Sequence, residues 1–295
     1  MEKFFKLKES GTDVKTELTA GVITFLSMVY ILAINPSILS GCGMDAGAVF
    51  TATAISAAAA TLFMAFFANY PIALASGMGL NAYFSYSVCG QMAAEGISDP
   101  WTVALAAVLV EGIIFILLSL SKFREALVND VPSNLKLGIS TGIGLFIVIV
   151  GLKGAGIVVA DPSTILTMGD IATPSVALAF IGLIAVAVMY HYKVPGYILW
   201  GILLTWILGM IAQACGWYVV DPAAGANSLF PDFSNGIGIS APYLFAFNFD
   251  YISSHLVEFA VIVFAFLFVD LFDTAGTVIG VANKGGMLDE NGDLP

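Results

Sequence analysis

The chain has 295 residues, of which 59% are hydrophobic and 11% are charged, and its formal net charge is −11. Soluble domains carry about 25% charged residues, and their interiors have no room for so much apolar surface. The composition therefore excludes a soluble globular domain and predicts that a lipid bilayer is the main solvent. Because the acidic residues are spread over loops rather than gathered in a block, they predict solvation and no nucleic-acid partner.

Eight segments are predicted to span the membrane, since a spanning helix needs about 20 mostly apolar residues. In chain order they are 18–39, 46–68, 71–92, 102–120, 134–152, 174–192, 196–215 and 255–281. The third contains several glycines and an asparagine, so we expect a broken helix there. The predicted fold class is an all-α polytopic membrane protein with about eight transmembrane spans and a broken span 3.

The basic residues predict the orientation, because Lys and Arg gather on the cytoplasmic side of membrane proteins. With a cytoplasmic N-terminus, nine of the 10 Lys and Arg residues face the cytoplasm, and only Lys153 does not. Leaving out the third span would reverse every later loop and destroy this pattern. We therefore expect a multi-pass protein of the cell inner (cytoplasmic) membrane with both ends in the cytoplasm.

Two acids interrupt the last apolar segment, in "LFVDLFDTAGT" (267–277). A carboxylate at the bilayer centre costs about 2.5–3.5 kcal/mol on insertion scales, and such residues usually mark a substrate or proton pathway. Asp270 and Asp273 are three residues apart, so they share one helix face, with Thr274 on or beside it. This face is predicted to point into the protein. A structural pair satisfied by a neighbouring helix is the alternative.

A second unusual stretch is "ASGMGLNAYF" (75–84), in which Gly77 and Gly79 loosen the helix and Asn81 adds an amide. Non-helical backbone at membrane depth is tolerated where it is buried or lines a cavity, and transporters aim such segments at a ligand. A packing notch fits these residues equally well. Glu111, in the fourth span, fits a proton relay and an interhelical hydrogen bond equally.

Motifs of other chemistries are missing from the sequence. It has no phosphate loop, nucleophile elbow or metal-spaced His/Cys cluster, and its 3 cysteines form no CxxC pair. We therefore predict no catalytic residue, metal or cofactor. An intramembrane aspartyl protease would need two acids on different helices that share a proton, and two acids on one helix suit that chemistry badly.

Four stretches resemble the nucleobase–cation symporters of the xanthine/uracil permease superfamily, in particular the adenine/guanine/hypoxanthine permease branch. They are "TAGVITFLSMVYILAINPSIL" (19–39), "ANYPIALASGMGLNAYF" (68–84), "NLKLGISTGIGLFIVIVGLKGAGIV" (134–158) and "FVDLFDTAGTVIGVANKGGMLDENGDLP" (268–295). The resemblance runs along essentially the whole chain. It implies fourteen spans in two inverted seven-span repeats, with half-helices at spans 3 and 10 that meet at the binding site.

The resemblance also implies a division into core and gate domains. Residues 1–133 are expected to hold core spans 1–4 with the N-terminal tail and an interfacial helix at 121–133. Residues 134–215 hold gate spans 5–7, residues 216–254 form an outer loop, and residues 255–295 hold core span 8 and the start of a cytoplasmic loop. Spans 9–14, with the span-10 acidic segment, are then missing from this chain, and a homodimer is left open.

The implied function is secondary active, proton-coupled uptake of purine nucleobases, with sodium as the alternative coupling ion. The resemblance makes Asp270 the acid that contacts the base. Substrate-binding positions are expected at Asp270, Asp273, Thr274, Asn81, Gly79 and Leu80, and proton-coupling positions at Asp270, Asp273 and Glu111. Ser76 departs from the proline that the family pattern has before "GMGLNAY". A permease for xanthine, uracil or a small anion, and a non-transporting fragment or assembly partner, are the alternatives.

Overall fold

The computed structural model describes residues 5, 7, 11–120, 133–220, 228–230 and 239–285. Outside these ranges lie the predicted interfacial helix, except for its last residue, and part of the predicted outer loop. The predicted cytoplasmic loop after residue 285 also lies outside them. The chain divides into two compact units, one made of Met1–Ala33 with Val148–Gly238 and the other of Ile34–Ile147 with Ile239–Pro295. The predicted core and gate boundaries stay a prediction.

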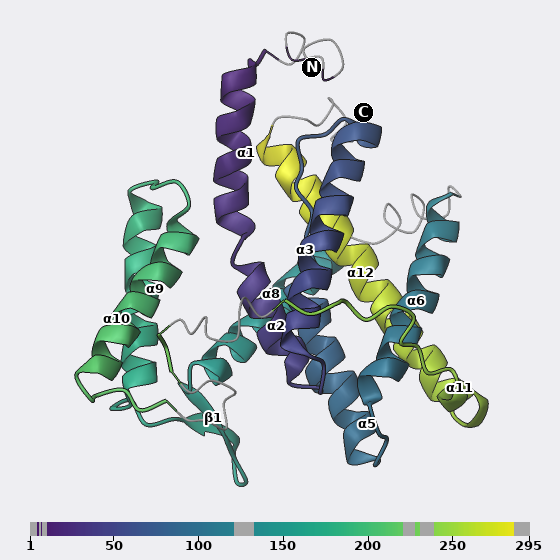
Figure 1. Ribbon diagram of the computed structural model, residues 1–295. Helices are drawn as coiled ribbons and strands as arrows, with labels where there is room; N and C mark the ends of the chain where they lie inside the picture. Colours follow the sequence, from purple (N-terminus) through teal and green to yellow (C-terminus); the bar gives the residue numbers. More distant parts are fainter. Residues whose placement is uncertain are drawn as a thin grey trace. The chain divides into compact units, whose positions relative to one another are not determined.

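The described elements are mostly helical (Figure 1). Before residue 120 they are α1 (Val14–Met28), α2 (Ile31–Ser40), α3 (Ala46–Phe63), α4 (Met78–Ala82), α5 (Gly90–Ala94) and α6 (Pro100–Ser119), with π-helical segments η1 (Met64–Ala68) and η2 (Tyr83–Cys89). After it come α8 (Ser133–Gly154), β1 (Val158–Asp161), β2 (Ile165–Met168), α9 (Pro174–His191), α10 (Tyr197–Ala214), α11 (Asp250–Ser254) and α12 (Leu256–Lys284).

Several helices have the length and composition of membrane spans. Among the described residues, 5 segments qualify: Val14–Ser40, Ala46–Ala68, Pro100–Ser119, Pro174–His191 and Tyr197–Ala214. Each overlaps a predicted span. The predicted span at 134–152 falls inside α8, and the one at 255–281 begins one residue before α12 and ends inside it. A polytopic, mostly helical membrane protein is therefore confirmed, whereas the exact number of crossings stays a prediction.

The all-α expectation is wrong at residues 158–168, where β1 and β2 pair antiparallel with Val158 opposite Met168. The turn between them is built on Asp161, whose Oδ1 accepts hydrogen bonds from the backbone N–H groups of Ser163 (2.7 Å) and Thr164 (2.9 Å). Such a side-chain turn competes with helix formation. The hairpin is only four residues per strand, too short to stand out beside long apolar helices.

In the first unit, α9 packs closely against α10. A Cβ added to Gly182 would collide with Thr205, and one added to Gly201 would collide with Val186. Small residues let helices approach closely in membranes, where packing rather than the hydrophobic effect drives association. After α10, Gln213 holds the chain through bonds to the Ser228 hydroxyl (3.0 Å) and the Leu229 N–H (2.8 Å).

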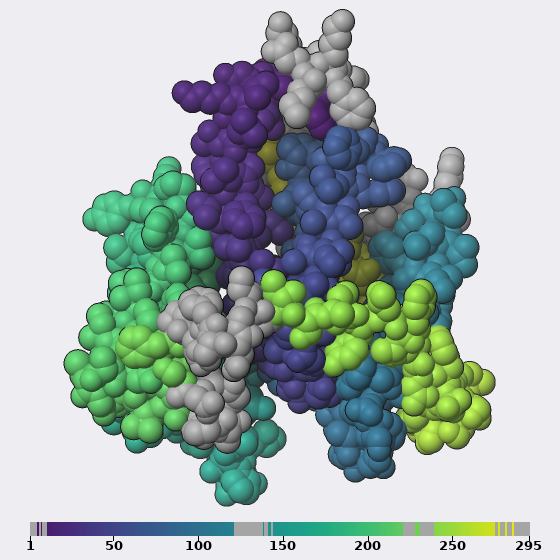
Figure 2. Space-filling view, in the orientation of Figure 1, coloured from purple at the N-terminus to yellow at the C-terminus, as the bar shows by residue number. Residues whose placement is uncertain are grey.

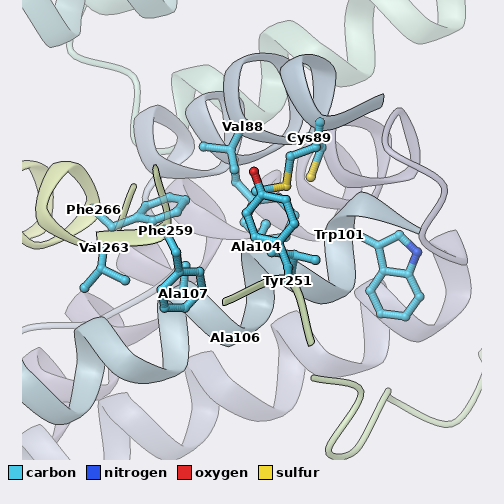
Figure 3. Packing of buried hydrophobic residues seen from close by; sticks show 13 residues of the cluster. Val88, Cys89, Trp101, Ala104, Ala106, Ala107, Tyr251, Phe259, Val263 and Phe266 are labelled. Carbon is cyan, nitrogen blue, oxygen red and sulfur yellow. The ribbon is translucent and has the colours of Figure 1, made fainter. Parts of the chain in front are cut away.

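The core of the second unit lies where α6 and α12 meet η2 (Figure 3). From α6 it buries Val103, Ala104, Ala106 and Ala107, each 0% exposed. The alanines keep this face of α6 flat, so α12 can approach with Phe259 and Phe266. Phe266 in turn packs edge-on against Tyr83 of η2, with ring centroids 5.3 Å apart. This packing fixes α12 against the broken third span.

A segment that is neither helix nor strand, residues 239–249, leads into α11 and lies on the face seen in Figure 2. The Asp45 N–H, before α3, donates to the Tyr243 hydroxyl (3.1 Å), and the Tyr243 ring packs on Trp101 at the start of α6. Asp45 also caps α3 by accepting from the Ala48 N–H, and this bond holds the pKa of the Asp45 carboxyl below its usual value.

The third predicted span is broken, as expected. Residues 69–77 are not helical, and Gly77 has extended backbone (φ −75°, ψ 123°) immediately before α4. From Met78 the chain is helical through α4, η2 and α5. The glycines and the amide of this stretch predict extended or broken backbone from Ala75 to Asn81, which is correct only for 75–77. Gly79 and Asn81 lie inside the helix.

The Thr61 hydroxyl, on α3, pairs with backbone groups of the non-helical segment 69–77 in span 3. The Thr61 Oγ1 donates to the Leu74 carbonyl (3.2 Å) and accepts from the Leu74 N–H (3.0 Å). A backbone group left unpaired in a membrane costs several kcal/mol, because no water replaces the lost bond. Thr61 therefore pairs the carbonyl and the N–H of Leu74 in a stretch where no helix can do so.

Candidate functional site

The acidic face of α12 begins with Asp270, which is half-buried. The Thr274 hydroxyl, one turn later, donates to Asp270 Oδ1 at 3.3 Å. Asp273 is also half-buried, as its position on the same face predicts. Figure 1 shows α12 lying beside α6, which contributes a third acid to the same region.

Asp273 lies close to Gly77, the last residue of the non-helical segment 69–77 in span 3. A Cβ built on Gly77 would lie 2.9 Å from Asp273 Oδ2, closer than real Cβ contacts allow. Glycine at position 77 is therefore required for this approach. Gly77 precedes a helical run that has no side-chain cap. The free N–H groups and the dipole of a helix start favour a carboxylate, so the position suits Asp273.

Glu111 lies on α6 and is only 7% exposed. Its carboxyl interacts electrostatically with that of Asp270, and its Oε1 has no hydrogen-bond partner among the described residues. The structure therefore brings Glu111 together with Asp270 of α12. The sequence left a proton relay and an interhelical hydrogen bond open for Glu111. This Oε1 gives no support to the hydrogen bond.

Asn81 belongs to a separate polar cluster. Its Nδ2 donates to Ser76 Oγ (2.6 Å) and to Asn35 Oδ1, and the Asn35 Nδ2 donates to Thr53 Oγ1 (2.8 Å). Asn35 comes from α2 and Thr53 from α3. Asp273 of α12 lies beside Gly77, and Asn81 donates a hydrogen bond to the adjacent Ser76. The two clusters therefore meet at neighbouring residues of span 3. Gly79 is buried, and Leu80 packs against the hydrophobic core.

Sequence reasoning missed Asn35 and Thr53, which are 4% exposed each. The only signal for Asn35 was an amide beside a proline in an otherwise apolar span. Thr53 carries no signal at all, because a helix commonly satisfies a threonine hydroxyl with its own carbonyl. A partner 18 residues away in the chain, as Asn35 and Thr53 are, becomes visible only in the folded protein.

Many secondary transporters build their substrate sites from discontinuous membrane helices. The second unit of this polytopic membrane protein has such a broken span, and its helical part starts beside the acid-bearing α12. The chain belongs to the permease family, whose sequence model (Xan_ur_permease) matches residues 15–290.

Curated relatives carry this similarity along the whole chain. It is 42% identical over 287 residues to the guanine/hypoxanthine permease PbuO of Bacillus subtilis, covering 97% of this chain and 63% of the relative. It is 37% identical over 296 residues to the adenine permease AdeP of Escherichia coli, covering 100% and 62%. It is 41% identical over 300 residues to PbuG of Bacillus subtilis, a guanine/hypoxanthine permease, covering 99% and 64%.

The chain therefore spans less than two thirds of the length of these relatives. The resemblance to the nucleobase permeases, which the sequence motifs indicated, is confirmed. Family membership also places the chain among permeases rather than among enzymes, so the aspartyl-protease alternative has no support.

Proposed function

We propose that the full-length protein containing this chain is a secondary active transporter that takes up purine nucleobases across the cytoplasmic membrane, coupled to protons. The observation that carries the proposal is the approach of the Asp273 carboxylate to Gly77, at the start of the helical part of span 3. The names of the relatives, which are adenine and guanine/hypoxanthine permeases, supply the substrate class.

The chemistry of a purine suits these residues. A ring N–H left unpaired in a buried site costs about 1–3 kcal/mol, and a carboxylate accepts it in a strong, charge-assisted hydrogen bond. In this proposal Asp270 accepts from the base, with Thr274, Gly79, Leu80 and Asn81 around it. The remainder of the full-length protein, expected to contain spans 9–14, completes the site.

Coupling is assigned to the carboxyls of the second unit. Asp273 is the proposed proton carrier. Glu111 interacts with Asp270, and the two carboxyls are proposed to exchange a proton. Two like-charged acids in a poorly solvated region favour one shared proton over two negative charges. Sodium is the alternative coupling ion. If an imposed sodium gradient drives accumulation and a proton gradient does not, sodium rather than the proton is the coupling ion.

Uptake by the full-length protein tests the function. In cells that lack their own purine permeases, labelled adenine, guanine or hypoxanthine should accumulate, and dissipating the proton gradient should abolish accumulation. Unlabelled adenine, guanine, hypoxanthine, xanthine and uracil serve as competitors. Competition by uracil or xanthine alone would favour the alternative nucleobase permeases, and transport of none would favour a non-transporting protein.

We also propose a cytoplasmic N-terminus, because nine of the 10 basic residues then face the cytoplasm. In a cysteine-free variant of the full-length protein, Val219→Cys should react with a membrane-impermeant maleimide added outside, and Tyr192→Cys should react only after permeabilisation. Both side chains are well exposed, at 85% and 74%, so accessibility within the fold does not distinguish them. Labelling of both from the same side would contradict the topology.

A further inference from the structure

Asn35 has no role in the function proposed so far, although it is one of the few buried polar residues that the structure describes. It lies in α2, is 4% exposed, and sits between the Thr53 hydroxyl and the Asn81 amide. We propose that Asn35 is a positioning residue, held by Thr53, that orients the Asn81 amide so that its oxygen faces the substrate. This inference rests on the proposed contact between Asn81 and a purine.

The direction of these hydrogen bonds follows from one backbone carbonyl. The Thr53 hydroxyl donates its single hydrogen to the Val49 carbonyl (2.7 Å), so toward Asn35 it can only accept. Asn35 must therefore present its NH₂ group to Thr53, as the 2.8 Å bond requires. The Asn35 oxygen is then left to face Asn81, which must present its own NH₂ group.

Ser76 completes the orientation at the other side of Asn81. The Asn81 Nδ2 carries two hydrogens, and it donates to both Asn35 Oδ1 and Ser76 Oγ. Both donors of the amide are thereby used within the protein. In the described part of the chain, the side-chain hydrogen bonds of Asn81 are these two, and both use its nitrogen. The amide is therefore fixed as a hydrogen-bond acceptor for a bound molecule, and a purine N–H is the matching donor.

Loss of Asn35 should therefore act on substrate affinity through Asn81. Without Asn35, the Asn81 amide can rotate and present either its nitrogen or its oxygen to the site. In a fraction of the molecules the NH₂ group then faces the purine N–H, and no hydrogen bond forms. A packing residue would instead lower the amount of folded protein or the turnover rate. The difference is measurable as a change in KM with little change in kcat.

The test uses purine uptake by the full-length protein, normalised to the amount at the cell surface. Asn81→Ala should raise KM about tenfold, and Asn35→Ala should raise KM about fivefold to tenfold, each with kcat within about twofold. The double variant should resemble Asn81→Ala alone, because residues that act as one unit are non-additive. Thr53→Val should raise KM about threefold, and Thr53→Ser, which keeps the hydroxyl, should be near wild type.

Thr51→Val is the matched control, since within the described part of the chain the Thr51 hydroxyl bonds only to the Gly47 carbonyl of its own helix (3.0 Å). It should leave KM unchanged. A KM effect of Asn35→Ala that adds fully to that of Asn81→Ala, or a loss in kcat alone, would overturn the positioning role and leave the proposed function intact. Unchanged KM in Asn81→Ala would remove the substrate contact and the inference together.

Discussion

Replacing Asp270 by asparagine is expected to lower the kcat/KM for purine uptake of the full-length protein about 100-fold. The carboxylate is proposed to accept a ring N–H, and hydrogen bonds to charged groups contribute about 1.5–3 kcal/mol, compared with about 0.5–1.5 kcal/mol for neutral pairs. Asparagine keeps the volume but loses the charge and one acceptor. Uptake of labelled purine at several concentrations, with surface expression controlled, measures this effect.

Two other acids serve as controls for Asp270. Glu258 is on the same helix but exposed, with its carboxylate accepting from the Tyr251 hydroxyl (3.0 Å), and Glu258→Gln should leave uptake within about twofold. Glu111→Gln should damage uptake less than Asp270→Asn, since Glu111 is not proposed to touch the base. Near-normal uptake by Asp270→Asn would mean that the acid is structural.

Asp273→Asn is expected to separate binding from accumulation. Asparagine cannot release or take up a proton, so the variant should exchange labelled for unlabelled purine across the membrane but should not concentrate it. A gradient of about one pH unit stores about 1.4 kcal/mol, enough for about tenfold accumulation of a neutral base, and this accumulation should disappear. Concentrative, pH-dependent uptake by Asp273→Asn would exclude it as the proton carrier.

The position of Asp273 can be tested without changing its chemistry. In Gly77→Ala the new methyl group would lie 2.9 Å from Asp273 Oδ2, so the carboxylate must move away from the helix start. We expect a loss of accumulation similar to that of Asp273→Asn. Gly90→Ala is the control on the same helical run, because a Cβ there meets nothing within 4 Å. Equal effects of the two glycine variants would indicate a general loss of helix packing.

The composition and periodicity of the chain were sufficient to predict its main helices and the acidic face of α12. Apolar segments of spanning length have few alternatives in a membrane, and two acids three residues apart must share a helix face. The break in span 3 was also predicted, because glycines and an amide are unusual inside an apolar span. Its position was not, since helix boundaries depend on tertiary partners such as Asp273 and Thr61.

Contacts between distant segments could not be predicted from the sequence alone. Asn35 and Asn81 are 46 residues apart, and nothing in their local sequences indicates that one amide faces the other. The approach of Glu111 to Asp270 is of the same kind, because it depends on how α6 packs against α12. Local patterns show which residues avoid lipid, and only the fold shows which of them meet.

The hydroxyl of Thr61 has a consequence for how tolerance to substitution should be interpreted. One small side chain must both donate to and accept from Leu74, and serine is the natural residue closest to meeting that demand. In a saturation survey of variants, position 61 should therefore be as intolerant as a residue that touches the transported molecule. That intolerance would reflect the backbone structure of span 3 and would say nothing about substrate selectivity.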